Sequence, residues 1–187
     1  MYSNYKKKRK PIYDETTGVP PTEEQIEKMT QQAKNVAFYW VDQADKSRHE
    51  LFTKIKNKGI TDDIANEVLD SLEEKDYIND QRFAENFVYS KQTYEKLGKR
   101  AIGFRLKSKG VAQHIIDSVL MEIVEDDEET AARDIIERKL LSTASLEPQK
   151  RLTRLASLLV RKGYSTSMAF RVVKEMIALE AEENYDE

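Results

Sequence analysis

Three glycines divide the chain in the same way, and this recurrence constrains the fold more than any other feature of the sequence. Gly59, Gly110 and Gly163 follow one another at intervals of about 50 residues, a period typical of a repeated supersecondary unit. The residues before and after each glycine repeat their apolar positions with the periodicity of a helix that buries one face. Each repeat is therefore predicted to contain a helix, a tight glycine turn and a second helix.

Glycine suits this turn for a mechanical reason. The residue after a helix C-terminus commonly adopts a left-handed backbone conformation, which costs glycine little. The positive charge of the lysine before each glycine interacts favourably with the negative end of the helix dipole. We expect Thr61 and Ser165 to cap the helices that follow in the first and third repeats. Ala112, at the corresponding position of the second repeat, has no side-chain oxygen with which to do so.

A further amphipathic stretch precedes each pair of helices, and we expect these additional helices at about residues 23–45, 80–94 and 127–141. The sequence thus predicts an all-α protein of three tandem three-helix repeats. Small repeats complete their cores by stacking, so we expect an elongated, curved helical array. The expected divisions are a disordered basic N-terminal tail at 1–22, repeats at 23–76, 77–125 and 126–180, and an acidic C-terminal tail at 181–187.

Composition agrees with a helical protein. With 6 glycines and 4 prolines among 187 residues, the chain has few of the turn residues that a many-stranded sheet requires. The absence of cysteine excludes disulfides and thiolate zinc sites and agrees with a reducing compartment. The longest apolar run, LASLLV at 155–160, is too short to cross a bilayer, and the N-terminus lacks the apolar stretch of a secretion signal. We therefore expect a cytoplasmic, monomeric protein without a membrane contact.

The residues that could support catalysis or metal binding lack the necessary spacing. His49 and His114 belong to different repeats, and adjacent acids such as Asp126 and Asp127 have no nucleophile or ligand pattern beside them. No phosphate-binding loop of the Gly-x-x-x-x-Gly-Lys-Ser/Thr type is present. We expect no enzymatic activity, no metal and no cofactor. We expect the aromatic residues at helical spacing to belong to the core and not to base-stacking platforms: Phe38, Trp40, Tyr77, Phe83 and Phe87.

The charged residues, 35 % of the chain, are segregated along it although the net charge is only −3. The helix before each glycine is basic, and the helix after it is mostly acidic. If the repeats stack in register, the basic helices form a stripe that suits a polyanion or the groove of a protein–DNA filament. The alternative is that basic and acidic helices neutralise one another as solvated faces. The candidate filament- or DNA-binding residues of the stripe are Lys54, Lys56, Lys58, Lys99, Arg100, Arg105, Lys107, Lys109, Arg151, Arg154, Arg161 and Lys162.

Three segments resemble the RecX family of bacterial regulators of the RecA recombinase: SRHELFTKIKNKGI at 47–60, YINDQRFAENFVYSK at 77–91 and GKRAIGFRLKSKGV at 98–111. The resemblance implies tandem three-helix repeats, binding to RecA filaments and inhibition of strand exchange, ATP hydrolysis and filament extension. The charge pattern, and not the resemblance, adds single- and double-stranded DNA as an expected partner of the basic stripe. The sequence departs from the family pattern at Arg105, where members often carry glutamate, and at Gly103. We expect a bend or a close backbone contact at this glycine.

Two other classes of function stay open at the level of the residues. A helix, a glycine turn and a helix also describe a helix-turn-helix DNA-binding protein. Asp62, Asp63 and Glu67 argue against it, because acids in the first turns of a recognition helix would repel phosphates. The chain could instead be a helical adapter for another protein. The main partner recovered from a cell lysate distinguishes these classes, and recovery of RecA would support the first.

Overall fold

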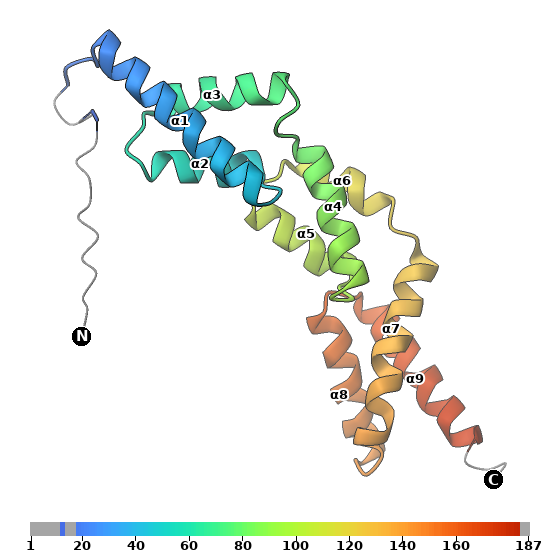
Figure 1. Ribbon diagram of the computed structural model, residues 1–187. Coiled ribbons are helices and arrows are strands. Elements are labelled where there is room, and N and C mark those ends of the chain that lie inside the picture. Colours follow the sequence, from blue (N-terminus) through green and yellow to red (C-terminus); the bar gives the residue numbers. More distant parts are fainter. Residues whose placement is uncertain (1–11, 14–17, 184–187) are drawn as a thin grey trace, which may run out of the picture. The chain divides into compact units, whose positions relative to one another are not determined.

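The computed structural model describes residues 12–13 and 18–183, which form nine α-helices, a short 3-10 helix and no strand (Figure 1). This confirms the prediction of an all-α chain of three three-helix repeats. The chain divides into two compact units, the first ending at Phe83 and the second beginning at Ala84, so that the division falls near the start of α4 (Asp80–Thr93).

The first unit consists mainly of three helices that pack on one another: α1 (Glu23–Gln43), α2 (Arg48–Lys56) and α3 (Asp62–Glu74) (Figure 1). Capping boxes begin α1 and α2. The side chains of Thr22 and Ser47 accept hydrogen bonds from the backbone N–H groups of Gln25 and Glu50, whose own side chains accept hydrogen bonds from the backbone N–H groups of Thr22 and Ser47. The core between the helices is apolar and includes Met29, Leu51, Ile55, Ile60, Val68 and Leu69.

The second unit contains most of α4 and the remaining helices: α5 (Lys99–Ser108), α6 (Gln113–Met121), α7 (Glu125–Leu140), the 3-10 helix Leu141–Thr143, α8 (Pro148–Arg161) and α9 (Thr166–Glu183). α5 packs on α6, while α7, α8 and α9 pack together (Figure 1). The core of these last three helices includes Ile136, Leu155, Leu159, Tyr164 and Val172.

The glycine turns have the expected backbone. The φ angles of Gly59, Gly110 and Gly163 are 74°, 76° and 96°, in the region that favours glycine. The Ser165 hydroxyl accepts a hydrogen bond from the Met168 backbone N–H at 3.1 Å, which confirms the cap expected in the third repeat. The corresponding expectation for Thr61 is wrong: this residue occupies the N-cap position of α3, but its side chain accepts no capping hydrogen bond.

The second and third repeats meet at two glycines. The Gly98 N–H donates to the Lys162 carbonyl oxygen at 2.9 Å, and the Arg100 N–H donates to the Gly163 carbonyl oxygen at 3.2 Å. A Cβ added at Gly98 would lie 2.7 Å from the Gly163 backbone, and one added at Gly163 would lie 2.4 Å from Ala101. The backbones therefore approach more closely than any other residue type allows at these positions.

A buried tyrosine reinforces this contact. The Tyr164 side chain is fully buried, and its hydroxyl donates a hydrogen bond to the Lys96 carbonyl oxygen at 3.0 Å. Burial raises the pKa of Tyr164, and the negative charges of Glu128 and Asp134 act in the same direction, so the hydroxyl remains a neutral donor. Together with the glycine contacts, this bond joins the end of α8 to the start of α5 within the second unit.

Two aromatic residues differ from their expected place in the core. Phe83 is buried, and Trp40 and Phe87 are partly buried. Phe38 and Tyr77, however, are 44 % and 52 % exposed, and their rings form an edge-to-face contact with centroids 5.4 Å apart. The sequence pattern predicts both residues in the core. In the structure their rings instead contact each other at the surface of the first unit.

The predicted tails at 1–22 and 181–187 lie in large part outside the described residues. Where the structure describes them, it shows contacts that a disordered tail lacks. Ile12 and Tyr13 pack against the core of the first unit, and the Tyr13 hydroxyl donates to the Val19 carbonyl oxygen at 2.7 Å. At the other end, α9 continues through residue 183, beyond the expected repeat boundary at 180.

Candidate functional site

α5 carries a phenylalanine that faces solvent among cations. Phe104 is 75 % exposed, although Ile102 and Leu106 on the same helix are fully buried. Helix residues three and four positions apart lie on one side, so Phe104 stands beside Arg100 and Lys107. The buried pair holds α5 in place, and the ring is left available for contact with another molecule.

Open hollows lie on both sides of this ring. The first lies between α5 and α6 and includes Lys99, Lys107, Ile116 and Leu120, and the second lies where α5 meets the end of α8 and includes Arg105, Val160 and Arg161. Arg100 and Phe104 line both hollows and form the ridge between them. We call this surface the Phe104 face and define it by Lys99, Arg100, Phe104, Arg105, Lys107 and Arg161.

Gly103 explains how α5 approaches α6 beneath this face. The helix continues through the glycine, and a Cβ added there would lie 2.9 Å from Cδ1 of Leu120. The close neighbour at Gly103 is thus a side chain of α6, where the sequence led us to expect a bend or a close backbone contact. The missing Cβ leaves room for Leu120 at the floor of the first hollow.

The cations of the Phe104 face differ in whether they form an ion pair with an acidic side chain. Arg105 Nη1 donates to Glu95 Oε2 at 2.6 Å, and Lys91 binds the same carboxylate. Hydrogen bonds from Lys91 and then Arg105 lower the pKa of Glu95 below its usual value. Within the described part of the chain, Arg100, Lys107 and Arg161 form no ion pair with an acidic side chain. These three charges are available to an anionic ligand.

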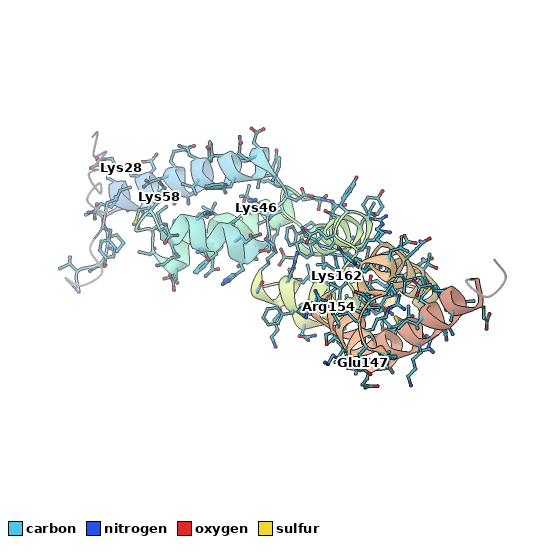
Figure 2. All side chains as sticks on the ribbon, turned by 90° about the horizontal axis from the view of Figure 1, so that it is seen from below. Lys28, Lys46, Lys58, Glu147, Arg154 and Lys162 are labelled. Atoms are coloured by element: carbon cyan, nitrogen blue, oxygen red, sulfur yellow. The ribbon has the colours of Figure 1, made fainter. Side chains whose placement is uncertain are left out.

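The candidate cations of the first unit are mostly engaged by their own unit. Lys54 Nζ lies 4.2 Å from the ring centroid of Trp40, and Lys56 pairs with Asp62 at 2.5 Å. Lys58 is exposed at the turn after α2, in the first unit (Figure 2). α2 therefore presents less free positive charge than its sequence indicates.

The candidates of the third repeat divide in the same way. Arg151 is only 9 % exposed, and Nη2 binds both Glu180 Oε2 at 2.6 Å and the Leu140 carbonyl oxygen at 3.0 Å. Its inclusion among surface ligands is therefore wrong, because the side chain is buried in an internal network. Lys162 Nζ donates to the Glu95 carbonyl oxygen at 2.7 Å, whereas Arg154 is exposed on α8 (Figure 2).

The remaining candidate, Lys109, lies at the C-terminal end of α5 with Nζ 5.8 Å from the ring centroid of Phe87. The structure thus brings Lys99, Arg100, Arg105, Lys107 and Arg161 together on one face. Of the other candidates of the second unit, Lys109, Arg151 and Lys162 make the contacts given above, and exposed Arg154 does not line either hollow.

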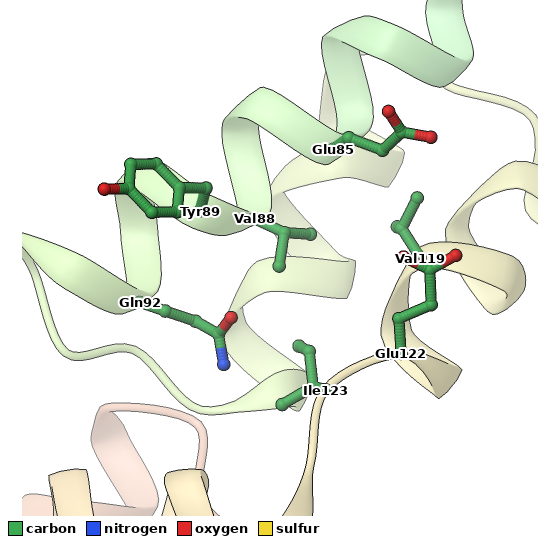
Figure 3. Close-up of a pocket in the computed structure, with 7 residues that line it drawn as sticks. All are labelled: Glu85, Val88, Tyr89, Gln92, Val119, Glu122 and Ile123. Carbon is green, nitrogen blue, oxygen red and sulfur yellow. The ribbon is translucent and has the colours of Figure 1, made fainter.

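A further hollow of the second unit has the opposite character. It lies between α4 and α6, with Val88, Val119 and Ile123 at its base and Glu85 and Glu122 at its rim (Figure 3). Carboxylates at this position repel phosphates. The two hollows beside Phe104 therefore match a polyanion better than the hollow between α4 and α6 does.

The described residues contain no group of three or more His, Asp or Glu side chains placed to hold a metal ion. Among the same residues, no helix has the length and apolar character needed to cross a membrane. The two histidines are both exposed and belong to different helices, α2 and α6.

Sequence reasoning missed Phe104, although a signal for it was present. The buried positions of α5 are Ile102 and Leu106, and Phe104 lies between them, on the far side of a 3.6-residue helix. A large aromatic residue out of phase with the apolar face, and flanked by cations at helical spacing, indicates a contact surface. The apolar pattern by itself identifies only the core positions of α5, and Phe104 lies outside that pattern.

The fold defines a protein of tandem three-helix repeats, and the Phe104 face is a basic surface formed by its second and third repeats. Family models for the first, second and third three-helix domains of RecX match residues 33–72, 79–120 and 126–173. The regulatory protein RecX of Streptomyces coelicolor is 37 % identical over 153 residues, which cover 82 % of this chain and 81 % of the relative. The chain belongs to the RecX family.

A further relative agrees with this assignment, and a solved structure shares the fold. The regulatory protein RecX of Mycolicibacterium smegmatis is 34 % identical over 177 residues, covering 91 % of this chain and 94 % of the relative. The crystal structure of RecX from Lactobacillus salivarius has the same fold, with a TM-score of 0.75 at 19 % identity, and the match covers 81 % of this chain and 98 % of that one. The resemblance noted in the sequence is thereby confirmed, and it assigns the chain to a family of regulatory proteins.

Proposed function

We propose that this protein binds RecA filaments on DNA and inhibits their strand exchange, ATP hydrolysis and extension. The match of RecX family models to all three repeats carries this proposal. The family is one of regulators, so the protein acts by occupying a partner and catalyses no reaction itself. Its place of action is the bacterial cytoplasm, where RecA meets chromosomal DNA, and it binds as a monomer.

The Phe104 face supplies the charge for this binding. Arg100 and Lys107 project from α5, and Arg161 reaches the same surface from the end of α8. A basic surface gains free energy on a polyanion because condensed counterions leave the nucleic acid.

A charge-reversal experiment tests the proposal. We expect the triple variant Arg100→Glu, Lys107→Glu, Arg161→Glu to lose most of its inhibition of strand exchange with purified RecA, ATP and single-stranded DNA. All three positions are outside the buried core, so the variant is expected to fold. Inhibition by the unaltered protein is expected to weaken as salt is added, because counterion release then contributes less.

A matched control reverses three exposed lysines elsewhere. Lys34, Lys75 and Lys174 lie on α1, after α3 and on α9, and all three are exposed. Their replacement by glutamate changes the net charge equally but leaves the Phe104 face intact, so inhibition is expected to persist. Full inhibition by the folded Arg100, Lys107 and Arg161 variant would contradict the assigned role of this face. Absence of inhibition by the unaltered protein would contradict the proposed function itself.

A further inference from the structure

The ridge formed by Phe104 between two cation-lined hollows is unlike an ordinary solvated charge surface. We propose that it is a binding site for single-stranded nucleic acid, with one base stacked on the Phe104 ring and the flanking phosphates on Arg100, Lys107 and Arg161. The proposal rests on the proposed function in assigning this face to the DNA component of a filament. Binding itself requires no recombinase.

The first step concerns the ring. Phe104 is 75 % exposed and serves no core, because Ile102 and Leu106 already fill the buried side of α5. A phenylalanine at an exposed position leaves apolar surface in contact with water and adds no buried area to the core. Stacking a base removes that surface from water, and every base offers a face for stacking whatever the sequence.

The second step concerns the charges. Arg100 lines both hollows together with Phe104, Lys107 lines the hollow toward α6, and Arg161 lines the hollow toward α8. A strand that crosses the ridge therefore meets a cation before, beside and after the stacked base. This arrangement of an aromatic ring within a basic track is the one by which proteins bind single strands.

The third step concerns rigidity. Arg161 belongs to a different repeat from Phe104, but it immediately precedes Lys162, whose carbonyl oxygen accepts a hydrogen bond from the Gly98 N–H at the start of α5. The buried Tyr164 hydroxyl adds a bond from the third repeat to Lys96. The chain segments that carry the cations on both sides of the ridge are consequently joined by hydrogen bonds, so that binding has to order side chains but not the backbone segments that carry them.

Strand selectivity follows from this geometry. Bases in a duplex are stacked on their neighbours, so their faces are closed to Phe104, whereas bases of a single strand can turn onto the ring. Cations alone bind both forms through phosphates. The Phe104 face is therefore expected to prefer single strands to duplex, and this preference is expected to depend on the ring.

The test measures binding without RecA, by fluorescence anisotropy of a labelled oligothymidylate, an oligouridylate and a DNA duplex of equal length. We expect Phe104→Ala to weaken binding of oligothymidylate by roughly 5- to 150-fold, as for the loss of one stacked base. Its duplex binding is expected to change by less than about twofold, because phosphate contacts remain. Phe104→Tyr keeps a ring and is expected to bind like the unaltered protein.

Tyr94→Ala is the matched control, because Tyr94 is an aromatic residue of 78 % exposure just after α4 and outside the Phe104 face. It is expected to leave both affinities unchanged. Equal affinities for oligothymidylate and oligouridylate would support recognition by stacking of single strands of both DNA and RNA. A preference for DNA would support the filament strand as the natural occupant, and tighter binding of oligouridylate would overturn that assignment.

Two outcomes would overturn the proposal. One is unchanged oligothymidylate binding by a folded Phe104→Ala variant, and the other is an equal loss of single-strand and duplex binding. If that variant keeps its single-strand affinity but no longer inhibits RecA, then Phe104 contacts the recombinase and this inference fails while the proposed function stands. If single strands bind through Phe104 but the unaltered protein does not inhibit RecA, the inference stands and the proposed function fails.

Discussion

α2 and α5 are the same helix in two successive repeats, and they use their cations differently. Leu51 and Ile55 of α2 correspond to Ile102 and Leu106 of α5, and all four are fully buried. The backbone contacts also correspond, because the Arg48 N–H donates to Asp80 Oδ1 and the Lys99 N–H donates to Glu128 Oε1, both at 2.8 Å. In each case an acid near the start of the next repeat binds the first N–H of the helix.

The side chains outside the core differ. The guanidinium of Arg48 is held by Asn66 and Glu73, each at 3.1 Å, and by Asp70, all on α3. At the position that corresponds to Phe104, α2 has Thr53, whose hydroxyl donates to the His49 carbonyl oxygen at 3.0 Å. The comparison teaches that the repeat preserves its buried contacts, whereas its outer positions are free to become either an internal ion network or a binding face.

The largest expected effect concerns the glycine turns. Gly163→Ala places a Cβ 2.4 Å from Ala101 at a φ of 96°. Backbone strain and overpacking together are expected to lower the free energy of unfolding by about 2–5 kcal/mol. Gly59→Ala meets mainly the strain of a positive φ, since Gly59 is exposed, and is expected to cost about 1–2 kcal/mol. Denaturant unfolding monitored by circular dichroism compares them. Equal losses would show that the close approach to α5 adds nothing.

The second prediction separates two arginines of α8. Arg151→Met removes a buried cation that binds Glu180 and is expected to destabilise the protein by about 2–3 kcal/mol, because the hydrogen bonds from the guanidinium to the carboxylate and to the Leu140 carbonyl oxygen are lost. Arg154→Met changes an exposed side chain and is expected to stay within about 0.5 kcal/mol. Thermal unfolding measures both, and a comparable effect of the two substitutions would refute the assignment of Arg151 to the interior.

The third prediction is a pH dependence at the edge of the Phe104 face. Lys91 and Arg105 lower the pKa of Glu95 in the folded protein below its ordinary value of 4.5. A lowered folded-state pKa contributes stability above the unfolded value, and this contribution is lost as the pH falls through the folded value. Glu95→Gln is expected to remove less than about 1 kcal/mol near neutral pH, because the pair is partly exposed.

The difference in unfolding free energy between Glu95→Gln and the unaltered protein is expected to shrink as the pH falls below about 4.5. Urea unfolding at a series of pH values measures it. A difference that stays constant across this range would show that ionisation of Glu95 contributes nothing to the fold.

The smallest expected effect tests whether an aromatic residue alone makes a binding face. Thr53→Phe introduces a ring at the α2 position that corresponds to Phe104. Lys56 there pairs with Asp62, and Lys54 lies on Trp40, so the cations beside the new ring are already engaged. Affinity for oligothymidylate is expected to change by less than about twofold. A clear gain would mean that charge pairing within α2 does not limit binding.

Much of the fold was predictable because helix periodicity and a left-handed turn leave local marks in a sequence. Leu51, Ile102 and Leu155 share one offset from their glycines, and all three are buried. The candidate site was predictable only as a set of cations. Arg151 and Arg100 have the same kind of sequence context, a basic helix before a glycine, yet one is buried and the other exposed.

The sequence by itself determined the three repeats, their glycine turns, the helix faces that form the core and the membership in the RecX family. These properties depend on spacing along the chain, which sets the side of a helix on which each residue lies. Only the tertiary structure decided which charges remain free. Three features depend on contacts between different helices, which spacing within one helix does not specify: the pairing of Arg48 with α3, the burial of Arg151 and the meeting of Arg161 with Phe104.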